Sequence, residues 1–201
     1  MLKVGLTGSI AVGKSFVCEV LRELGCHVLD ADKTAREVVA PGTDGLAEIV
    51  RHFGEDVLQS DGELDRKKIG GIVFADETKR LLLNSIIHPR VFESQDKWIR
   101  DVESADPNGI AFIDAALMIE SGGYKRFNKI VVVWCEPAIQ LRRLMVRDNF
   151  DENAAKMRIA AQMSQDEKKQ FADFLIDTSA GYDDTRQKVE KLVSQLKNLS
   201  P

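Results

Sequence analysis

Short apolar runs alternate with segments of helical periodicity along most of the chain. Five runs rich in Val, Ile, Leu and Phe predict β-strands, at Val4–Leu6, His27–Leu29, Ile110–Ile113, Lys129–Trp134 and Phe174–Ile176. Between the first two runs, apolar residues at helical spacing predict a helix that Gly25 can end: Val17, Val20, Leu21 and Leu24. This alternation is typical of α/β proteins, so we expect a three-layer fold with a five-stranded parallel sheet.

The middle of the chain, residues 33–108, has helical periodicity and no strand pattern. It holds one apolar stripe at Leu46, Ile49, Val50 and Phe53, followed by a turn at Asp61-Gly62. Thr78–Glu103 is also helix-like, and we expect a break at His88-Pro89 because proline lacks the N–H that a helix needs. So long an interval between strands favours a helical insertion at the edge of the core, suited to binding an acceptor substrate.

Basic residues concentrate in residues 141–169, at Arg142, Arg143, Arg147, Lys156, Arg158, Lys168 and Lys169. We expect a helical lid that brings positive charge to a ligand; the alternative is a solvated helix face. Further on, Val189, Leu192, Val193 and Leu196 predict a last helix that packs on the sheet. The predicted organisation is one domain, 1–201, with a core at 1–32, 109–140 and 170–201, an acceptor subdomain at 33–108 and a lid at 141–169.

Composition narrows the class of protein. The chain has 44% hydrophobic residues and 30% charged residues, which excludes disordered and low-complexity classes. The 28 Lys and Arg against 32 Asp and Glu give a net charge of −4, which argues against a general binder of nucleic acid or acidic membranes. Three cysteines without C-x-x-C spacing, and an N-terminus without a signal-peptide pattern, lead us to expect buried free thiols in a cytoplasmic protein.

The most specific motif is the octapeptide Gly8-Ser9-Ile10-Ala11-Val12-Gly13-Lys14-Ser15, which fits G-x-x-x-x-G-K-[S/T] between the first predicted strand and helix. Such a loop offers converging main-chain N–H groups and the positive end of a helix dipole to phosphates. Lys14 adds a charge for the β- and γ-phosphates, and the Ser15 hydroxyl can ligate Mg²⁺. We expect phosphate binding here and not an ordinary glycine turn.

Carboxylates at the ends of predicted strands bear on the fate of a bound phosphate. Asp30 and Asp32 follow the second strand, on the rim where the phosphate loop opens, and a carboxylate there can orient or deprotonate an acceptor hydroxyl. The alternative is that they cap a helix starting near Thr34. Asp114 ends the third strand, where an acid can contact Mg²⁺ through water or cap a turn. Glu120 can support the same rim or face solvent.

Beyond these motifs, the chain resembles the dephospho-CoA kinase family nearly from end to end. The matching residues are Gly5-Leu6-Thr7-Gly8, Asp30-Ala31-Asp32, Ala35-Arg36, Asp61-Gly62, Leu64-Asp65-Arg66, His88-Pro89, Gln140-Leu141, Arg143-Leu144, Arg147-Asp148, Arg158, Gln162, Glu167-Lys168, Ala172-Asp173 and Ile176-Asp177. The chain departs from the family pattern inside the phosphate loop, at Ala116–Glu120, and at Thr178, where Asn is usual.

This resemblance implies a P-loop kinase fold and transfer of the ATP γ-phosphoryl group to the ribose 3′-hydroxyl of dephospho-CoA, giving coenzyme A and ADP. It implies an ATP site at Gly8, Ala11, Val12, Gly13, Lys14, Ser15 and Phe16, with Mg²⁺ on Ser15. Lys14, Asp32, Arg143 and Arg147 are the implied catalytic residues, and the implied substrate-binding residues are Asp32, Asp65, Arg66, His88 and Asp114. We expect these small molecules as partners, no nucleic acid or membrane, and a monomer or weak homo-oligomer.

Two other readings of the phosphate loop remain open. A nucleoside or nucleotide kinase would have the same fold, lid and loop but another acceptor. A GTPase-like switch would need N-K-x-D and a D-x-x-G at the end of a strand. Asn128-Lys129-Ile130-Val131 lacks the Asp, and Asp106-Pro107-Asn108-Gly109 precedes a strand. The sequence therefore favours a kinase over a switch.

Overall fold

A five-stranded parallel sheet forms the centre of the structure, a computed structural model that describes residues 1–199. Its strands are β1 (Leu2–Thr7), β2 (His27–Asp30), β3 (Ile110–Asp114), β4 (Lys129–Trp134) and β5 (Phe174–Asp177). Each contains the run that predicted it, so the α/β class and the five-stranded parallel sheet are confirmed.

The strand order, β2-β3-β1-β4-β5, places β1 at the centre. After β1 the chain builds β2 and β3 on one side of it, then crosses to build β4 and β5 on the other. Such a reversal opens a crevice at the carboxyl end of the central strand, and this is where open α/β sheets bind ligands. The phosphate loop follows β1 directly, so it lies at that crevice.

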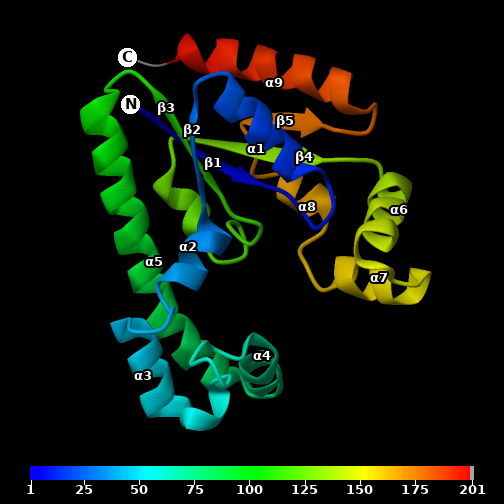
Figure 1. The fold of residues 1–201 in the computed structure, drawn as a ribbon. Helices are drawn as coiled ribbons and strands as arrows, with labels where there is room; N and C mark the ends of the chain where they lie inside the picture. Colours follow the sequence, from blue (N-terminus) through cyan, green and yellow to red (C-terminus); the bar gives the residue numbers. More distant parts are fainter. Residues whose placement is uncertain (200–201) are drawn as a thin grey trace. The chain divides into compact units, whose positions relative to one another are not determined.

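Two helices, α1 (Lys14–Glu23) and α9 (Tyr182–Lys197), pack on one face of the sheet (Figure 1). Their apolar stripes meet alternate strand residues in one buried cluster that includes Val4, Leu6, Val17, Leu21, Val131, Val133, Val189 and Leu192. Neighbouring strand residues point to the opposite face. There, a side chain on Gly5 would collide with Met118, Ile130 and Phe127, so this face is also covered.

The remaining helices after β4 are α6 (Pro137–Asp148), α7 (Glu152–Ala160) and α8 (Gln165–Lys169), and a short 3₁₀ helix, η2 (Gly123–Arg126), follows β3. The sheet and all these elements belong to one compact unit, Met1–Asp30 with Asp101–Pro201, of which residues up to 199 are described. None of the helices in residues 1–199 combines the length and the apolar character needed to cross a membrane.

A second compact unit, Ala31–Arg100, is helical, as the sequence predicts for this part of the chain. It contains α2 (Ala31–Glu37), α3 (Asp44–Phe53), the 3₁₀ helix η1 (Glu55–Val57), α4 (Arg66–Ala75) and most of α5 (Glu77–Ala105). It has a core of its own, formed by Val39, Leu46, Ile49, Val57, Leu64, Ile69, Leu83 and Ile86. Arg90 of α5 donates to Glu48 of α3 at 2.6 Å and so ties these two helices together.

The predicted break at His88-Pro89 is wrong, because α5 runs without interruption through Pro89. Proline inside a helix costs about 3 kcal/mol. Ile86 and Val91, on either side of it, are both buried, and burying an aliphatic side chain contributes about 1.5–3 kcal/mol. Arg90 also donates to the carbonyl oxygen of Ile86, at 2.7 Å. Packing on both sides therefore outweighs the local preference for a break.

Candidate active site

The phosphate loop connects the end of β1 at Thr7 to the start of α1 at Lys14. Ala11 and Gly13 have φ values of 61° and 90°, in the left-handed region. At Gly8 a side chain would overlap the carbonyl oxygen of Val133 in β4. Glycine is thus required at position 8 by close packing and favoured at position 13 by backbone conformation. The main chain that leads into α1 is shaped to present its N–H groups to an anion.

Lys14 and Asp114 are brought together at the carboxyl ends of neighbouring strands. Lys14 Nζ lies 2.6 Å from Asp114 Oδ1, and the two side chains are only 15% and 14% exposed. Asp114 is the last residue of β3. It pairs in register with Leu6, the residue before the last one of β1, and the phosphate loop follows β1. The thiol of Cys18 donates to the other carboxylate oxygen, Asp114 Oδ2, at 3.4 Å. Asp114 therefore holds the ammonium group of Lys14 beside the phosphate loop.

Oxygen ligands suited to Mg²⁺ are present next to this ion pair. Ser15, in the first turn of α1, is exposed, and Asp30 ends β2 in register with Asp114. No group of three or more His, Cys, Asp or Glu residues within 1–199 could hold a metal by itself. Mg²⁺ in kinases is usually held by one or two protein oxygens together with substrate phosphates and water. The donor set fits a magnesium ion that arrives with a nucleotide.

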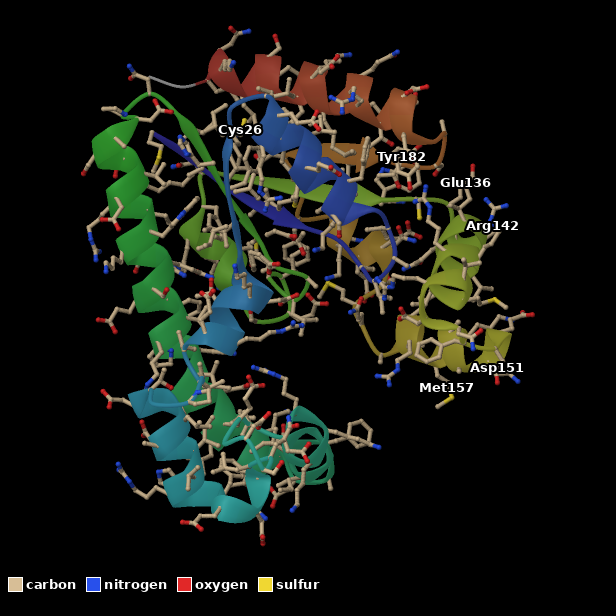
Figure 2. The ribbon with its side chains drawn as sticks, viewed as in Figure 1. Cys26, Glu136, Arg142, Asp151, Met157 and Tyr182 are labelled. Atoms are coloured by element: carbon tan, nitrogen blue, oxygen red, sulfur yellow. The ribbon has the colours of Figure 1, made fainter. Side chains whose placement is uncertain are left out.

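Arg143 is fastened to the phosphate loop through Thr178, the first residue after β5. Its guanidinium donates to Thr178 Oγ1 and to the Thr178 carbonyl oxygen, both at 2.8 Å. The Thr178 hydroxyl in turn donates to the carbonyl oxygen of Val12 at 2.7 Å. Arg142, the neighbouring residue on α6, is exposed at the outer side of the helix (Figure 2). Of the two predicted lid arginines, Arg143 is thus the one that the structure places beside the loop.

Arg147 is exposed and forms a two-pronged ion pair with its neighbour Asp148, at 2.7 and 2.9 Å. This hydrogen bonding raises the pKa of Arg147 and lowers the pKa of Asp148. The predicted role of Arg147 in catalysis therefore stays a prediction, since its guanidinium is engaged by a residue of its own helix.

The other predicted acceptor residues lie in the unit Ala31–Arg100. Asp32 is exposed in the first turn of α2, and His88 lies on α5 with its ring centroid 6.0 Å from that of Phe92. Asp65 caps α4: its Oδ1 accepts the Lys68 main-chain N–H at 2.9 Å. Arg66 follows directly. Desolvation lowers its pKa, and the positive charge of Arg36 lowers it further.

Lys168 differs from the other basic residues of the segment 141–169. The sequence groups it with the lid cations, yet its side chain is fully buried. Its Nζ lies 2.8 Å from a carboxylate oxygen of Glu120 and donates to the Ala116 carbonyl oxygen at 2.7 Å. The cost of burying the ammonium group is offset by a charged partner and a hydrogen bond. Lys168 thus joins α8 to the segment after β3 and is not part of a solvated lid surface.

Three glutamines to which the sequence motifs assign no role contact the phosphate loop or one another: Gln140, Gln162 and Gln165. For Gln140 the sequence holds a usable signal, because it lies four residues before Leu144 on α6 and both are buried. A polar side chain at such a position needs hydrogen-bond partners. Gln162 is one of the residues that match the dephospho-CoA kinase family, without an individual role, and Gln165, the first residue of α8, carries no comparable signal.

Cys18, Cys26 and Cys135 are buried free thiols, as the sequence predicts. Burial, followed by the nearby charge of Asp114, raises the pKa of Cys18 from 9.0 to about 12. The unfolded chain loses this proton near pH 9 while the folded protein keeps it, so this contribution to stability is lost as pH rises from 9 towards 12.

We therefore expect the serine substitution Cys18→Ser, which cannot ionise but still offers a donor to Asp114, to resist alkaline destabilisation. Urea unfolding at pH 8 and pH 10 measures this. Over that interval the wild-type protein should lose about 1.4 kcal/mol more stability than the variant. Equal losses of stability in the two proteins would contradict a Cys18 thiol that stays protonated in the folded protein.

A phosphate loop at the switch point of a parallel sheet, with a lysine held at the start of its helix and an arginine fastened to the loop, defines the class of P-loop kinases. Within that class the family is also established. The chain belongs to the dephospho-CoA kinase family, whose model matches residues 2–184. The resemblance seen in the sequence is confirmed.

Individual relatives cover nearly the whole chain. The dephospho-CoA kinase of Shouchella clausii is 46% identical over 188 residues, which are 94% of this chain and 95% of that protein. A dephospho-CoA kinase domain-containing protein of Danio rerio is 45% identical over 98% of this chain and 86% of its own length. Among solved structures, the dephospho-CoA kinase from Campylobacter jejuni is 29% identical, covers 98% of this chain and 97% of that one, and superposes with a TM-score of 0.73.

Proposed function

We propose that the chain transfers the γ-phosphoryl group of ATP to the ribose 3′-hydroxyl of dephospho-CoA, giving coenzyme A and ADP. The observation that carries this proposal is the complete phosphate loop, with Lys14 held by Asp114, in a chain that matches the dephospho-CoA kinase family over residues 2–184. ATP and dephospho-CoA are the two substrates, and the reaction is a direct transfer between them.

The donor site comprises the main-chain N–H groups of the loop and of the first turn of α1, at Gly8, Ala11, Val12, Gly13, Lys14, Ser15 and Phe16. Its support is the loop geometry, since converging N–H groups at a helix N-terminus bind phosphates. The Lys14 ammonium group bridges the β- and γ-phosphates, and Asp114 keeps it in place until ATP binds. Ser15 holds Mg²⁺, which when bound neutralises charge that builds up on the phosphates.

The proposed acceptor-binding residues Asp32, Asp65, Arg66 and His88 belong to the unit Ala31–Arg100. Asp114, which ends β3, is a further proposed substrate-binding residue. Asp32 orients or deprotonates the 3′-hydroxyl, and its place two residues beyond the end of β2 supports this role. Arg66 binds an anionic part of the acceptor. The positive charge of Arg36 supports this role, because it lowers the pKa of Arg66. A bound anion would offset the repulsion between the two guanidinium groups.

The segment 141–169 is the lid, and Arg143 and Arg147 bring positive charge to the transferred group. The hydrogen bonds of Arg143 to Thr178, whose hydroxyl binds the loop, support its role. Arg147 must first leave Asp148, a pair that costs little to break because exposed ion pairs contribute at most about 1 kcal/mol. We also propose a cytoplasmic location and a monomer or weak homo-oligomer; three buried free thiols support a reducing compartment.

An acceptor panel tests the proposed function. ADP release is measured with Mg-ATP and dephospho-CoA, adenosine or AMP, each over the same concentration range. We expect dephospho-CoA to be preferred by at least about tenfold in kcat/KM, because binding contacts to its extended part contribute to the transition state. A preference for AMP or adenosine would indicate a nucleotide or nucleoside kinase. ADP release that does not depend on any acceptor would indicate a hydrolase or a switch.

A further inference from the structure

Both peptide groups of Ile10, in the middle of the phosphate loop, are held by glutamine side chains. The Ile10 N–H donates to Gln162 Oε1 at 2.8 Å, and the Ile10 carbonyl oxygen accepts from Gln140 Nε2 at 2.8 Å. Gln140 lies on α6 and is 2% exposed, and Gln162 lies between α7 and α8. The loop is thus attached to the 141–169 segment and to α6 by side-chain amides.

A third glutamine continues this chain of hydrogen bonds to the sheet. Gln165, the first residue of α8, donates from Nε2 to Gln140 Oε1 at 2.8 Å. Its own oxygen, Oε1, accepts the main-chain N–H of Cys135 at 2.9 Å, just after β4. The hydrogen bonds therefore run without interruption from Cys135 through Gln165 and Gln140 to Ile10. We refer to Gln165 and Gln140 as the glutamine relay.

The two ends of the relay fix the orientation of both amides. The Cys135 N–H can only donate, so Gln165 must face it with oxygen and turn its NH₂ towards Gln140. Gln140 must then accept with oxygen, and its NH₂ is left pointing at the Ile10 carbonyl oxygen, which can only accept. Rotating either amide by half a turn would bring two donors or two acceptors together. One main-chain N–H at the end of β4 thus determines the direction of a hydrogen bond in the phosphate loop.

We propose that the glutamine relay positions the phosphate loop: it holds the carbonyl group of Ile10 so that the following N–H groups converge on the phosphates of ATP. This inference rests on the proposed function, since it assigns ATP to the loop. Gln140 and Gln165 are positioning residues and not catalytic residues, because they act on the main chain of the loop. The relay also joins α6 and α8 to the loop, so disturbing it acts on ATP and leaves the acceptor unit, Ala31–Arg100, unaffected.

The relay makes a specific prediction about methionine substitutions, which keep side-chain length and remove the amide. In Gln140→Met and in Gln165→Met we expect KM for ATP to rise about tenfold, because each change leaves buried polar groups without partners. KM for dephospho-CoA should change by less than about twofold. In the double variant the rise should be close to that of the more affected single variant, because one interruption already breaks the relay.

The matched control is Gln187→Met, an exposed glutamine on α9, which should leave both KM values unchanged. Parallel thermal unfolding without nucleotide shows whether each variant is folded. The proposal is overturned if the folded single variants keep wild-type KM for ATP, if both KM values rise together, or if the two effects multiply in the double variant. Lys14→Ala is measured in the same series, so that failure of the relay proposal can be distinguished from failure of the proposed function. Wild-type turnover of Lys14→Ala would reject the proposed function as well.

Gln165→Glu adds a second readout that a purely structural role would not move. When ionised, its carboxylate can still accept from Cys135 but has no donor for Gln140; when protonated, it has the same donor and acceptor as glutamine. We expect ATP affinity, measured by calorimetry between pH 4 and 8 to span the ordinary glutamate pKa of about 4.3, to recover at low pH beyond that of Gln165→Met, relative to wild type at each pH. If the ATP affinity of Gln165→Glu at low pH only reaches that of Gln165→Met, the recovery comes from removing the carboxylate charge and not from restoring a hydrogen-bond donor. That result would overturn the proposed relay.

Discussion

We expect replacement of Lys14 by alanine to lower kcat for dephospho-CoA on the order of a hundredfold or more. A preorganised charge at a phosphoryl-transfer site contributes about 3–4 kcal/mol to transition-state stabilisation, and each 1.36 kcal/mol corresponds to tenfold in rate. The same substitution removes the ion-pair partner of Asp114 at 2.6 Å, so the carboxylate at the end of β3 also loses its orientation. ADP release with saturating ATP and dephospho-CoA measures the effect.

The control for this variant is Lys191→Ala, which removes an exposed lysine from α9 and should leave kcat unchanged. Far-UV circular dichroism establishes that both variants fold. A folded Lys14→Ala protein with nearly wild-type turnover would show that the phosphates are not bound at this loop.

The second large effect is expected at Asp32. Asparagine has the same shape but cannot take up a proton, so Asp32→Asn should reduce transfer by about 10²–10⁴-fold while ATP still binds with its normal affinity. Calorimetric ATP binding and ADP release on the same preparation separate the two steps. A matched change at an exposed carboxylate of the same unit, Asp56→Asn, should alter neither.

The outcome at Asp32 discriminates between its two interpretations. Asp32 lies in the first turn of α2, where a carboxylate also interacts favourably with the helix dipole. If Asp32→Asn transfers phosphate at the wild-type rate and loses only stability, the residue serves the helix and not the acceptor hydroxyl. Lost ATP binding would instead mean that Asp32 belongs to the donor site.

Much of the core could be predicted from the sequence because its signals are local. Period-two or continuous apolar runs mark strands, and all five predicted runs lie inside observed strands. The glycine positions of the phosphate loop are local as well, since backbone conformation at Gly13 and close packing at Gly8 restrict them to glycine. Asp114 and Lys14 could be placed on the same rim because the carboxyl ends of parallel strands share one edge.

Other features depend on contacts between residues far apart in the sequence. Pro89 carries a local signal for a helix break, yet burial of Ile86 and Val91 keeps α5 continuous. In the sequence, Lys168 resembles the other basic residues of its segment. Only the structure shows that it pairs with Glu120, 48 residues away. Arg143 and Arg147 are alike in the sequence, and only the position of Thr178 after β5 distinguishes them.

The sequence alone therefore determined the sheet and the phosphate loop, because each follows from side-chain periodicity or backbone conformation over a few consecutive residues, and its resemblance to the dephospho-CoA kinase family indicated the kinase class. The tertiary structure decided which polar groups are paired: Lys14 with Asp114, Lys168 with Glu120, Arg143 with Thr178, and Ile10 with Gln140 and Gln162. A buried polar group must find a partner wherever the fold places one, and its distance along the chain does not restrict that choice.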